Sequence, residues 1–261
     1  DSFINQRTSG SEEFIEHIKE FTPEWAAPIC EVDADLIEEA AIIYGKGAPA
    51  AIYYTLGITE HICGVDNVQS LCNLALMTGN LGVTGGGINP MRGQNNIQGA
   101  GDCGAVPANF PGFQACADEA FAEKFSKAYG NKIDAQKGIT KVSALNQSGN
   151  EGPEGIHAML IDGENTVVTD PDKNHCENAL KSLDHLVVID LFMTETAQLA
   201  SVVFPATGFA ETDGVQTNTE RRVQRLRAAV PPPGEAKPDW WIISEIAKRM
   251  GNKNFDHFNS A

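Results

Sequence analysis

Apolar residues recur at helical spacing in several separate stretches of the chain. Between residues 11 and 20, Phe14, Ile15 and Ile18 share one face, and Ser11 stands at the position of an N-cap. Asp33 and Asp239 hold the equivalent position before two later stretches. The pattern therefore predicts amphipathic helices over residues 11–20, 33–45, 65–78, 116–128, 174–183 and 239–250.

Four short runs are apolar almost throughout and are typical of strands buried in a parallel sheet. They cover residues 49–56, 157–161, 185–190 and 201–205. Because these strands alternate with the predicted helices, the fold class is α/β, with right-handed parallel crossovers and a doubly wound sheet. Residues 130–153 are polar and show no strong period, so they are expected to form a long surface connection with room for a short helix.

The stretch from residue 79 to residue 112 is rich in glycine and proline, which argues against a long helix or a central strand there. In its middle, Arg92 is followed by the side-chain amides of Gln94, Asn95 and Asn96. A guanidinium with neighbouring amides suits a small planar anion such as a carboxylate. The alternative is a solvated loop that carries a surface arginine.

Polar residues follow the predicted strands where ligands bind in open α/β sheets, namely at their carboxyl ends. These turns cover residues 57–61, 163–165 and 191–195. Acidic and amide side chains there suit ribose hydroxyls and purine N–H groups, although helix capping and turn formation would need the same residue types. The phosphate-binding pattern G-x-G-x-x-G is missing at a strand–helix junction, so an NAD site is not supported.

The net negative charge of the chain argues against some classes of binding partner. The chain has 261 residues, a net charge of −16 and 42% hydrophobic residues, which indicates a packed core and argues against nucleic-acid or anionic-membrane partners. No apolar run is long enough to span a bilayer, and no signal peptide is visible. The only basic cluster lies within residues 217–227 and is expected to pair internally. The chain begins at Asp1, which is consistent with a processed protein or a piece of a longer one.

The six cysteines are scattered without C-x-x-C or Cys/His ligand spacing. In a chain of this size they are expected to be reduced, mostly buried thiols of a cytosolic protein, and no metal ligand is predicted in this chain.

Seven motifs spread over nearly the whole chain give it a family resemblance. They are Thr78–Gly82, Gly87–Gly99, Gly163–Asn165, Asp190–Ala197, Glu211–Gly214, Thr217–Gln224 and Pro238–Ala247. In this order they resemble the catalytic α subunits of molybdenum- or tungsten-dependent formate dehydrogenases, within the molybdopterin oxidoreductases. The run from Arg92 to Asn96 is specific to the formate dehydrogenase branch of that family.

The resemblance implies oxidation of formate to carbon dioxide, or the reverse, at molybdenum or tungsten held by two molybdopterin guanine dinucleotides. Family members are far longer. Their N-terminal part binds a [4Fe-4S] cluster and supplies the cysteine or selenocysteine metal ligand, and a C-terminal domain closes over the cofactor. This chain matches neither part, so it is expected to be a central portion that is inactive alone. The implied partners are the rest of the subunit and electron-transfer subunits of the iron–sulfur, flavin or hydrogenase type, and the implied location is cytoplasmic.

The resemblance also implies roles for individual residues. Arg92 would hold the formate carboxylate, and Gln94 would lie beside the pterin and the substrate. Two departures from the family pattern, Thr166 in place of a frequent proline and Cys103 in place of a common methionine, touch no proposed hydrogen bond. The implied cofactor-binding residues are Leu56, Gly57, Thr59, Glu60, Gly93, Gly163, Glu164, Asn165, Thr169, Asp190, Phe192 and Thr194.

By the same resemblance, residues 1–93 end a first α/β cofactor-binding domain and residues 94–210 form a second. Both are expected to be parts of doubly wound, Rossmann-like or flavodoxin-like parallel-sheet domains. Residues 211–261 would belong to an adjoining small domain with a helical or irregular segment. Two alternatives remain open: a cofactor-free scaffold subunit of the same fold, as in respiratory complex I, or a sister enzyme such as formylmethanofuran dehydrogenase or an assimilatory nitrate reductase. A scaffold has no reason to keep Arg92 and its amides, and the sister enzymes fit this run less well.

Overall fold

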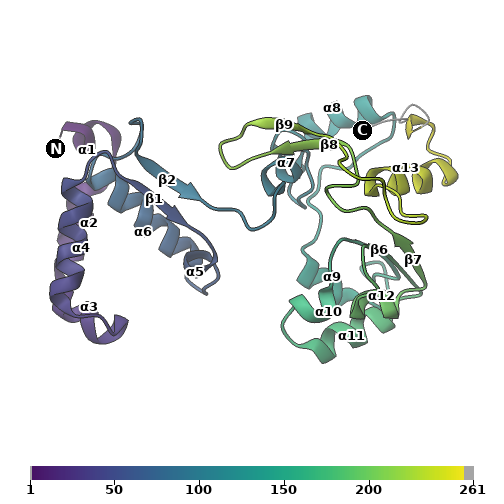
Figure 1. The fold of residues 1–261 in the computed structure, drawn as a ribbon, viewed down its shortest axis with the longest axis horizontal. Coiled ribbons are helices and arrows are strands. Elements are labelled where there is room, and N and C mark those ends of the chain that lie inside the picture. Colours follow the sequence, from purple (N-terminus) through teal and green to yellow (C-terminus); the bar gives the residue numbers. More distant parts are fainter. Residues whose placement is uncertain (1, 256–261) are drawn as a thin grey trace. The chain divides into compact units, whose positions relative to one another are not determined.

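The computed structural model describes residues 2–255. The chain forms two compact units, one up to Gln94 and one from Asn95 onward, and each is described by itself. Both are mixed α/β units with small parallel sheets (Figure 1).

The first unit consists of helices and one pair of strands. Its elements are α1 (Ser2–Arg7), α2 (Ser11–His17), η1 (Ile18–Glu20), α3 (Pro23–Cys30), α4 (Ala34–Lys46), β1 (Ala51–Tyr54), α5 (Leu56–Thr59), α6 (Gly64–Met77) and β2 (Gly87–Pro90). The predicted helices over 11–20, 33–45 and 65–78 are confirmed as α2 with η1, α4 and α6.

Strands β1 and β2 run parallel, with Ala51 opposite Gly87 and Tyr54 opposite Pro90. The buried side chain of Asn80 ties the end of α6 to the start of β1, because its Oδ1 accepts a hydrogen bond of 2.9 Å from the backbone N–H of Ala50. The sequence indicated a strand over 49–56 but placed β2 in an irregular stretch. Glycine and proline lower the local strand propensity of this stretch. The strand forms because it pairs with β1, and that tertiary contact cannot be predicted from the local sequence.

Local details of this unit differ from the sequence-based predictions. The N-cap of α2 is Gly10, at φ 72°, and Ser11 is the first helical residue. Asp33 precedes α4 as predicted, but its side chain makes no capping hydrogen bond. Strand β1 was predicted to be buried, yet Tyr53 is 69% exposed, because no layer among the described residues of this unit covers its face.

The second unit contains a three-stranded parallel sheet and an antiparallel hairpin. Its elements are α7 (Ile97–Asp102), β3 (Asn109–Phe110), β4 (Gln114–Ala115), α8 (Glu119–Tyr129), α9 (Lys141–Gln147), β5 (Ala158–Asp162), α10 (Thr166–Thr169), α11 (Lys173–Lys181), β6 (His185–Asp190), α12 (Glu195–Leu199), β7 (Val202–Pro205), β8 (Gly214–Thr217), β9 (Val223–Leu226), α13 (Asp239–Arg249) and η2 (Lys253–Phe255). The three predicted strands and the helices over 116–128, 174–183 and 239–250 are thus present.

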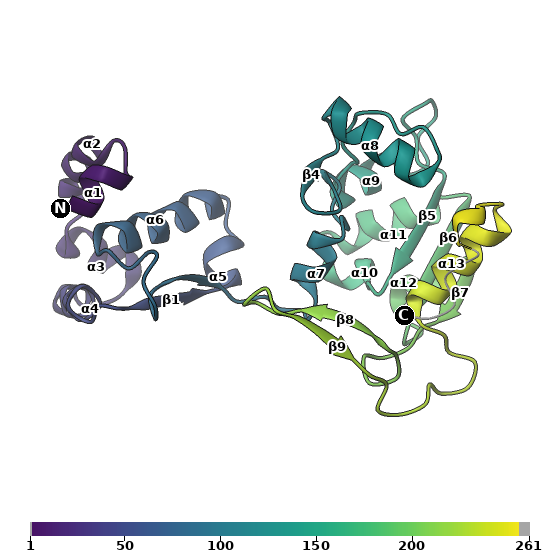
Figure 2. The same ribbon diagram turned by 90° about the horizontal axis from the view of Figure 1, so that it is seen from above.

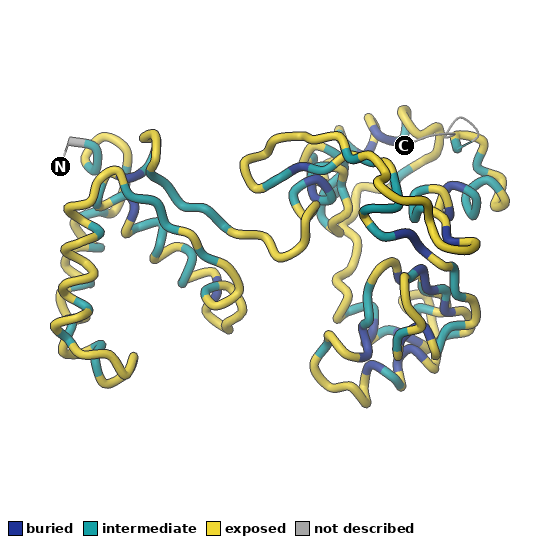
Figure 3. The backbone as a smooth tube through the Cα atoms, viewed as in Figure 1, coloured by how far each residue is buried: buried dark blue, intermediate teal, exposed yellow. Residues whose placement is uncertain are grey.

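The sheet of the second unit is covered on both faces, and its strand order is β5-β6-β7. On one face Leu186 and Val188 pack against Leu180 of α11 and Ala197 of α12. On the other, Ile189 packs against Ile242 of α13 (Figure 2). Strand order does not reverse within these three strands, so a doubly wound sheet remains a prediction. Most of the buried hydrophobic residues of this unit belong to the two clusters on these faces, and Figure 3 shows where the backbone of the chain is buried.

Other segments have weak or ambiguous local signals. Residues 130–153, expected to be a surface connection with room for a short helix, contain the short helix α9 and therefore agree with that expectation. Asp239 is not the N-cap of α13 but its first residue, and Pro238 holds the N-cap position. Of the irregular end expected at 252–261, residues up to Phe255 include the turn η2, and the rest lies outside the described residues.

Candidate functional site

The candidate residues of the first unit gather at one edge of the β1–β2 pair. Leu56, Gly57 and Thr59 lie on α5, which begins directly after β1, and Glu60 follows it. Arg92, Gly93 and Gln94 follow β2. Met91 N–H donates a 2.8 Å hydrogen bond to the carbonyl of Tyr54, which extends the pairing beyond the strands. Because the strands are parallel, both groups lie at the carboxyl edge, where α/β sheets bind ligands.

Within this edge Arg92 has no acidic partner among the described residues, and its side chain is exposed. Gln94 is also exposed and makes no side-chain hydrogen bond in the described part of the chain. Leu56 is 55% exposed. These side chains are therefore free to contact a ligand.

The asparagine pair that follows Gln94 belongs to the second unit and is fixed to strand β8. Asn96 Oδ1 accepts a 2.9 Å hydrogen bond from Thr217 N–H, and Asn96 Nδ2 donates to the Val215 carbonyl at 3.4 Å. The Gln216 side chain donates to the Asn95 carbonyl at 2.9 Å. The amides of this motif therefore split into two kinds: Gln94 is free, whereas Asn96 anchors the chain to the hairpin.

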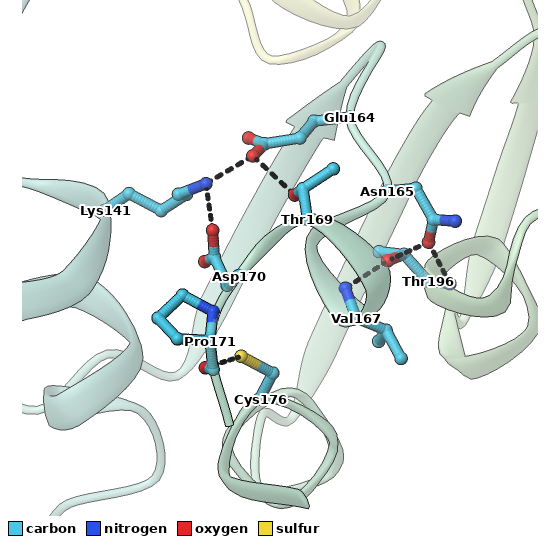
Figure 4. A network of polar contacts seen from close by, with 9 residues as sticks. All are labelled: Lys141, Glu164, Asn165, Val167, Thr169, Asp170, Pro171, Cys176 and Thr196. Carbon is cyan, nitrogen blue, oxygen red and sulfur yellow. Dashed lines mark hydrogen bonds and ion pairs between the residues drawn. The ribbon is translucent and has the colours of Figure 1, made fainter. Parts of the chain in front are cut away.

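In the second unit, the turn after β5 forms a dense polar network (Figure 4). Asn165 uses both the oxygen and the nitrogen of its side-chain amide inside the protein. Its Oδ1 accepts from Thr196 N–H at 3.2 Å and from the Thr196 hydroxyl at 2.9 Å, and its Nδ2 donates to Glu195 at 2.8 Å. The Thr196 hydroxyl also accepts from Val167 N–H at 3.1 Å. Asn165 therefore joins the turn to α12, and one N–H of its Nδ2 remains without a partner among the described residues.

We expect Asn165→Ala to destabilise the protein by about 2 kcal/mol. The change leaves the hydroxyl and N–H of Thr196, which is fully buried, without their acceptor. Urea unfolding measures the loss. Asn150→Ala is the matched control, since its amide makes one exposed bond to the Asn146 carbonyl, and it should change stability by less than about 0.5 kcal/mol. Equal effects of both substitutions would contradict the anchoring role of Asn165.

Three further candidates have defined local partners. Asp190 Oδ1 accepts from the N–H groups of Leu191 at 2.6 Å and Phe192 at 3.4 Å, which shapes the turn after β6. Thr194 caps α12 by accepting from Ala197 N–H at 3.2 Å, as its capping-type sequence indicated. Thr169 donates to Glu164 at 3.3 Å. Phe192, by contrast, is 75% exposed and presents a free aromatic ring.

Carboxylates converge at the same edge of the sheet from three elements. Asp162 ends β5, Asp190 ends β6 and Asp239 begins α13. Partial desolvation and the charge of Asp190 raise the pKa of Asp162. Burial, together with the charges of Asp162 and Asp190, raises the pKa of Asp239 to about 6, and its Oδ1 is buried without a hydrogen-bond partner in the described part of the chain. The cluster therefore offers acceptor oxygens that gain from an added donor.

Asp239→Asn should stabilise the protein at neutral pH and leave it nearly unchanged in acid. A folded-state pKa raised from 3.8 to about 6 means that stability present at low pH is lost as pH rises through this range. Converted in full, the pKa shift corresponds to a gain in unfolding free energy of about 3 kcal/mol. Because the group is only half-buried, screening by water reduces the expected gain to about 1 kcal/mol. Urea unfolding at about pH 4 and about pH 7.5 tests this, because the variant should gain stability only at the higher pH. An equal change at both would contradict it.

The sequence named Asp190 as a site residue but missed Asp162 and Asp239. Asp162 directly follows the predicted strand 157–161 and ends the observed strand β5, so its place at the carboxyl end was an available signal. Asp239 precedes a helical pattern and was interpreted as an N-cap. Its proximity to the other two carboxylates depends on how α13 packs against the sheet, which no local pattern shows.

The basic cluster was predicted to be an internal pairing surface, and the structure bears this out only for Arg225. Its residues form the β8–β9 hairpin, and Arg221 lies in the turn at φ 61°. Only Arg225 forms an ion pair among the described residues, with Asp213 at 3.4 Å. The remaining arginines are exposed, because the neighbouring strand residues carry too few acidic side chains to pair with them.

Within the described residues, no group of three or more His, Cys, Asp or Glu side chains is arranged to hold a metal ion. The same part of the chain holds no helix with the length and hydropathy that a bilayer crossing requires.

The model of the molybdopterin oxidoreductase family matches residues 3–249. The chain belongs to the molybdopterin oxidoreductase family. The resemblance found in its motifs is thereby confirmed.

Within the family, the chain is similar to formate dehydrogenase subunits. It is 50% identical to the F420-dependent formate dehydrogenase subunit alpha of Methanocaldococcus jannaschii, over 98% of this chain and 38% of that protein. It is 42% identical to formate dehydrogenase H of Escherichia coli, over 96% of this chain and 35% of that protein. The chain therefore spans little more than a third of the length of these relatives.

The fold is also similar to that of acetylene hydratase from Pelobacter acetylenicus. The TM-score is 0.73 at 21% identity, over 99% of this chain and 38% of the other. At this identity the likeness supports the mixed α/β fold alone.

Proposed function

We propose that the chain is the central portion of a formate dehydrogenase catalytic subunit. The complete subunit oxidises formate to carbon dioxide, or catalyses the reverse, at molybdenum or tungsten carried by two molybdopterin guanine dinucleotides. The observation that carries the proposal is Arg92, an exposed guanidinium without an acidic partner in the described part of the chain, at the carboxyl edge shared by β1 and β2. The identity of up to 50% to formate dehydrogenase subunits supports it.

Arg92 binds the formate carboxylate in this proposal. Two parallel N–H donors of the guanidinium match the two carboxylate oxygens, which fixes the direction of the formate C–H bond. Gln94 adds an amide donor beside the substrate and the pterin. When bound, the metal centre supplies the two-electron redox chemistry.

The second unit fits the guanosine end of one dinucleotide. Guanine presents N–H donors, and the cluster of Asp162, Asp190 and Asp239 presents acceptors, of which Asp239 Oδ1 is buried and unpaired. A donor placed there offsets the desolvation of the carboxylate. The exposed ring of Phe192 offers a face for stacking a purine. Gly163, at φ 64°, turns the chain so that Glu164 reaches this edge.

The remaining assignments extend this proposal to the complete subunit. Leu56, Gly57, Thr59, Glu60 and Gly93 contact the other dinucleotide at the edge of the first unit. In the complete subunit both sheets belong to doubly wound domains, and the [4Fe-4S] cluster and the metal ligand come from other parts of the same subunit. Its electrons pass to iron–sulfur, flavin or hydrogenase-type partners in the cytoplasm.

The test is to produce the complete subunit anaerobically and to measure two quantities. Formate-dependent reduction of a viologen dye reports activity, and guanine nucleotide released by acid reports the cofactor. The proposal requires both. Guanine nucleotide without formate oxidation would favour a sister oxidoreductase, and the lack of guanine nucleotide would favour a cofactor-free scaffold.

A further inference from the structure

Lys141 connects two acidic residues that flank helix α10. It is the first residue of α9, whose preceding Thr140 caps the helix by accepting from Ser143 N–H at 3.2 Å. The Lys141 ammonium forms ion pairs with Glu164, in the turn after β5, and with Asp170, directly after α10 (Figure 4). No sequence motif pointed to this lysine.

The contacts leave one half of the Glu164 carboxylate free. Glu164 Oε1 accepts from Lys141 and from the Thr169 hydroxyl. Glu164 Oε2 has no partner within the described residues. A carboxylate offers about four acceptor positions, so the free oxygen can still accept two donors. Because Oε1 is already held, the Glu164 side chain loses less conformational entropy when a ligand binds than an unrestrained glutamate would.

The charge of Lys141 is maintained in this position. Burial lowers its pKa, but the hydrogen bonds to Asp170 and Glu164 and the charges of these two carboxylates together outweigh this effect, and the pKa of Lys141 is raised. The ammonium therefore separates two carboxylates that would otherwise repel each other. The side chain of Asp170 is only 10% exposed, which makes its pairing with Lys141 the more important of the two for stability.

We propose that Lys141 is a positioning residue that holds Glu164 for a ribose diol. The free oxygen of Glu164 then accepts hydrogen bonds from the 2′- and 3′-hydroxyls of the cofactor guanosine, as acidic residues do at the equivalent edge of other nucleotide-binding sheets. This inference rests on the proposed guanosine site of the second unit.

The probes are GDP and 2′,3′-dideoxy-GDP, titrated calorimetrically into the complete subunit prepared without cofactor. The wild type should bind GDP at least about tenfold more tightly than the dideoxy analogue, because one hydrogen bond to a charged group already accounts for a factor of this size and the analogue loses two. Lys141→Gln should lose most of this preference and bind the dideoxy analogue as the wild type does. Lys141→Arg should retain the preference, because it keeps the charge and the donors.

Two further variants separate positioning from folding. Glu164→Gln should also lose the diol preference, and adding Lys141→Gln to it should cause no further loss. If Lys141→Gln fails to fold because Asp170 is left unpaired, Lys141→Gln with Asp170→Asn removes that charge and still releases Glu164. Lys132→Gln is the matched control, since it breaks an exposed ion pair of 2.9 Å with Asp134 and should leave the preference unchanged.

The outcomes distinguish this inference from the function on which it rests. A wild type that binds neither nucleotide contradicts the guanosine site and the inference together. A wild type that binds both equally leaves the guanosine site standing and overturns the role of Glu164 and Lys141. If Lys141→Gln weakens both nucleotides by the same factor, Lys141 has only a structural role and the inference is wrong.

Discussion

Arg92→Ala is expected to lower kcat/KM for formate by about a hundredfold or more in the complete subunit. Each charge-assisted hydrogen bond to a carboxylate contributes about 1.5–3 kcal/mol, and about 1.4 kcal/mol corresponds to a factor of ten. Two such bonds are lost with the guanidinium. Arg92→Lys keeps the charge but not the planar pair of donors, so a partial loss is expected. Steady-state kinetics with a viologen acceptor measures both.

The loss must occur while the cofactor stays in place. Guanine nucleotide content should therefore match that of the wild type in both variants. Arg7→Ala is the control, because Arg7 is an exposed arginine of α1 that lies outside the β1–β2 edge and should leave kcat/KM unchanged. A near-normal kcat/KM for Arg92→Ala would show that another group binds formate.

The position of Arg92 shows what the sequence could predict of the site and what it could not. The motif around it identified the residue, and the run of apolar residues identified β1. That Leu56 and Arg92 lie at one edge follows only from the parallel pairing of β1 with β2. Because β2 reads Gly87-Ile88-Asn89-Pro90, its local propensity argues against a strand, and the tertiary pairing overrides that preference.

In the second unit, the hydrophobic pattern along the sequence correctly predicted the elements that are deeply buried. Strand β6 was predicted with its observed bounds, because its apolar run is buried on both faces. The β8–β9 hairpin was missed because its turn lacks Asn-Gly or Asp-Gly and places Arg221 at a positive φ that glycine usually adopts. Lys141 and Asp239 were not recognised as site residues, since both act through partners distant in sequence.

The second large effect is expected for a substitution in the buried strand β6. Ile189→Ala should destabilise the protein by about 2–5 kcal/mol, the usual range for truncating a buried isoleucine. Ile189 is fully buried and packs with Ala206 of the segment after β7 and with Ile242 of α13. Ile189→Val removes less volume and should lose only about 0.5–1.5 kcal/mol. Urea unfolding followed by circular dichroism gives the three free energies.

This packing also holds the first residue of α13 at the candidate site. Since Ile242 lies one turn beyond Asp239, a cavity at Ile189 loosens the helix that brings Asp239 to Asp162 and Asp190. Amide hydrogen exchange should therefore accelerate in α13 before it does in α11, which packs on the other face of the sheet. Val202→Ala is the control, because Val202 is 44% exposed on β7 and should cost less than about 1 kcal/mol. If Ile189→Ala cost no more than this control, α13 would not depend on the sheet, and the convergence of the three carboxylates would lack its support.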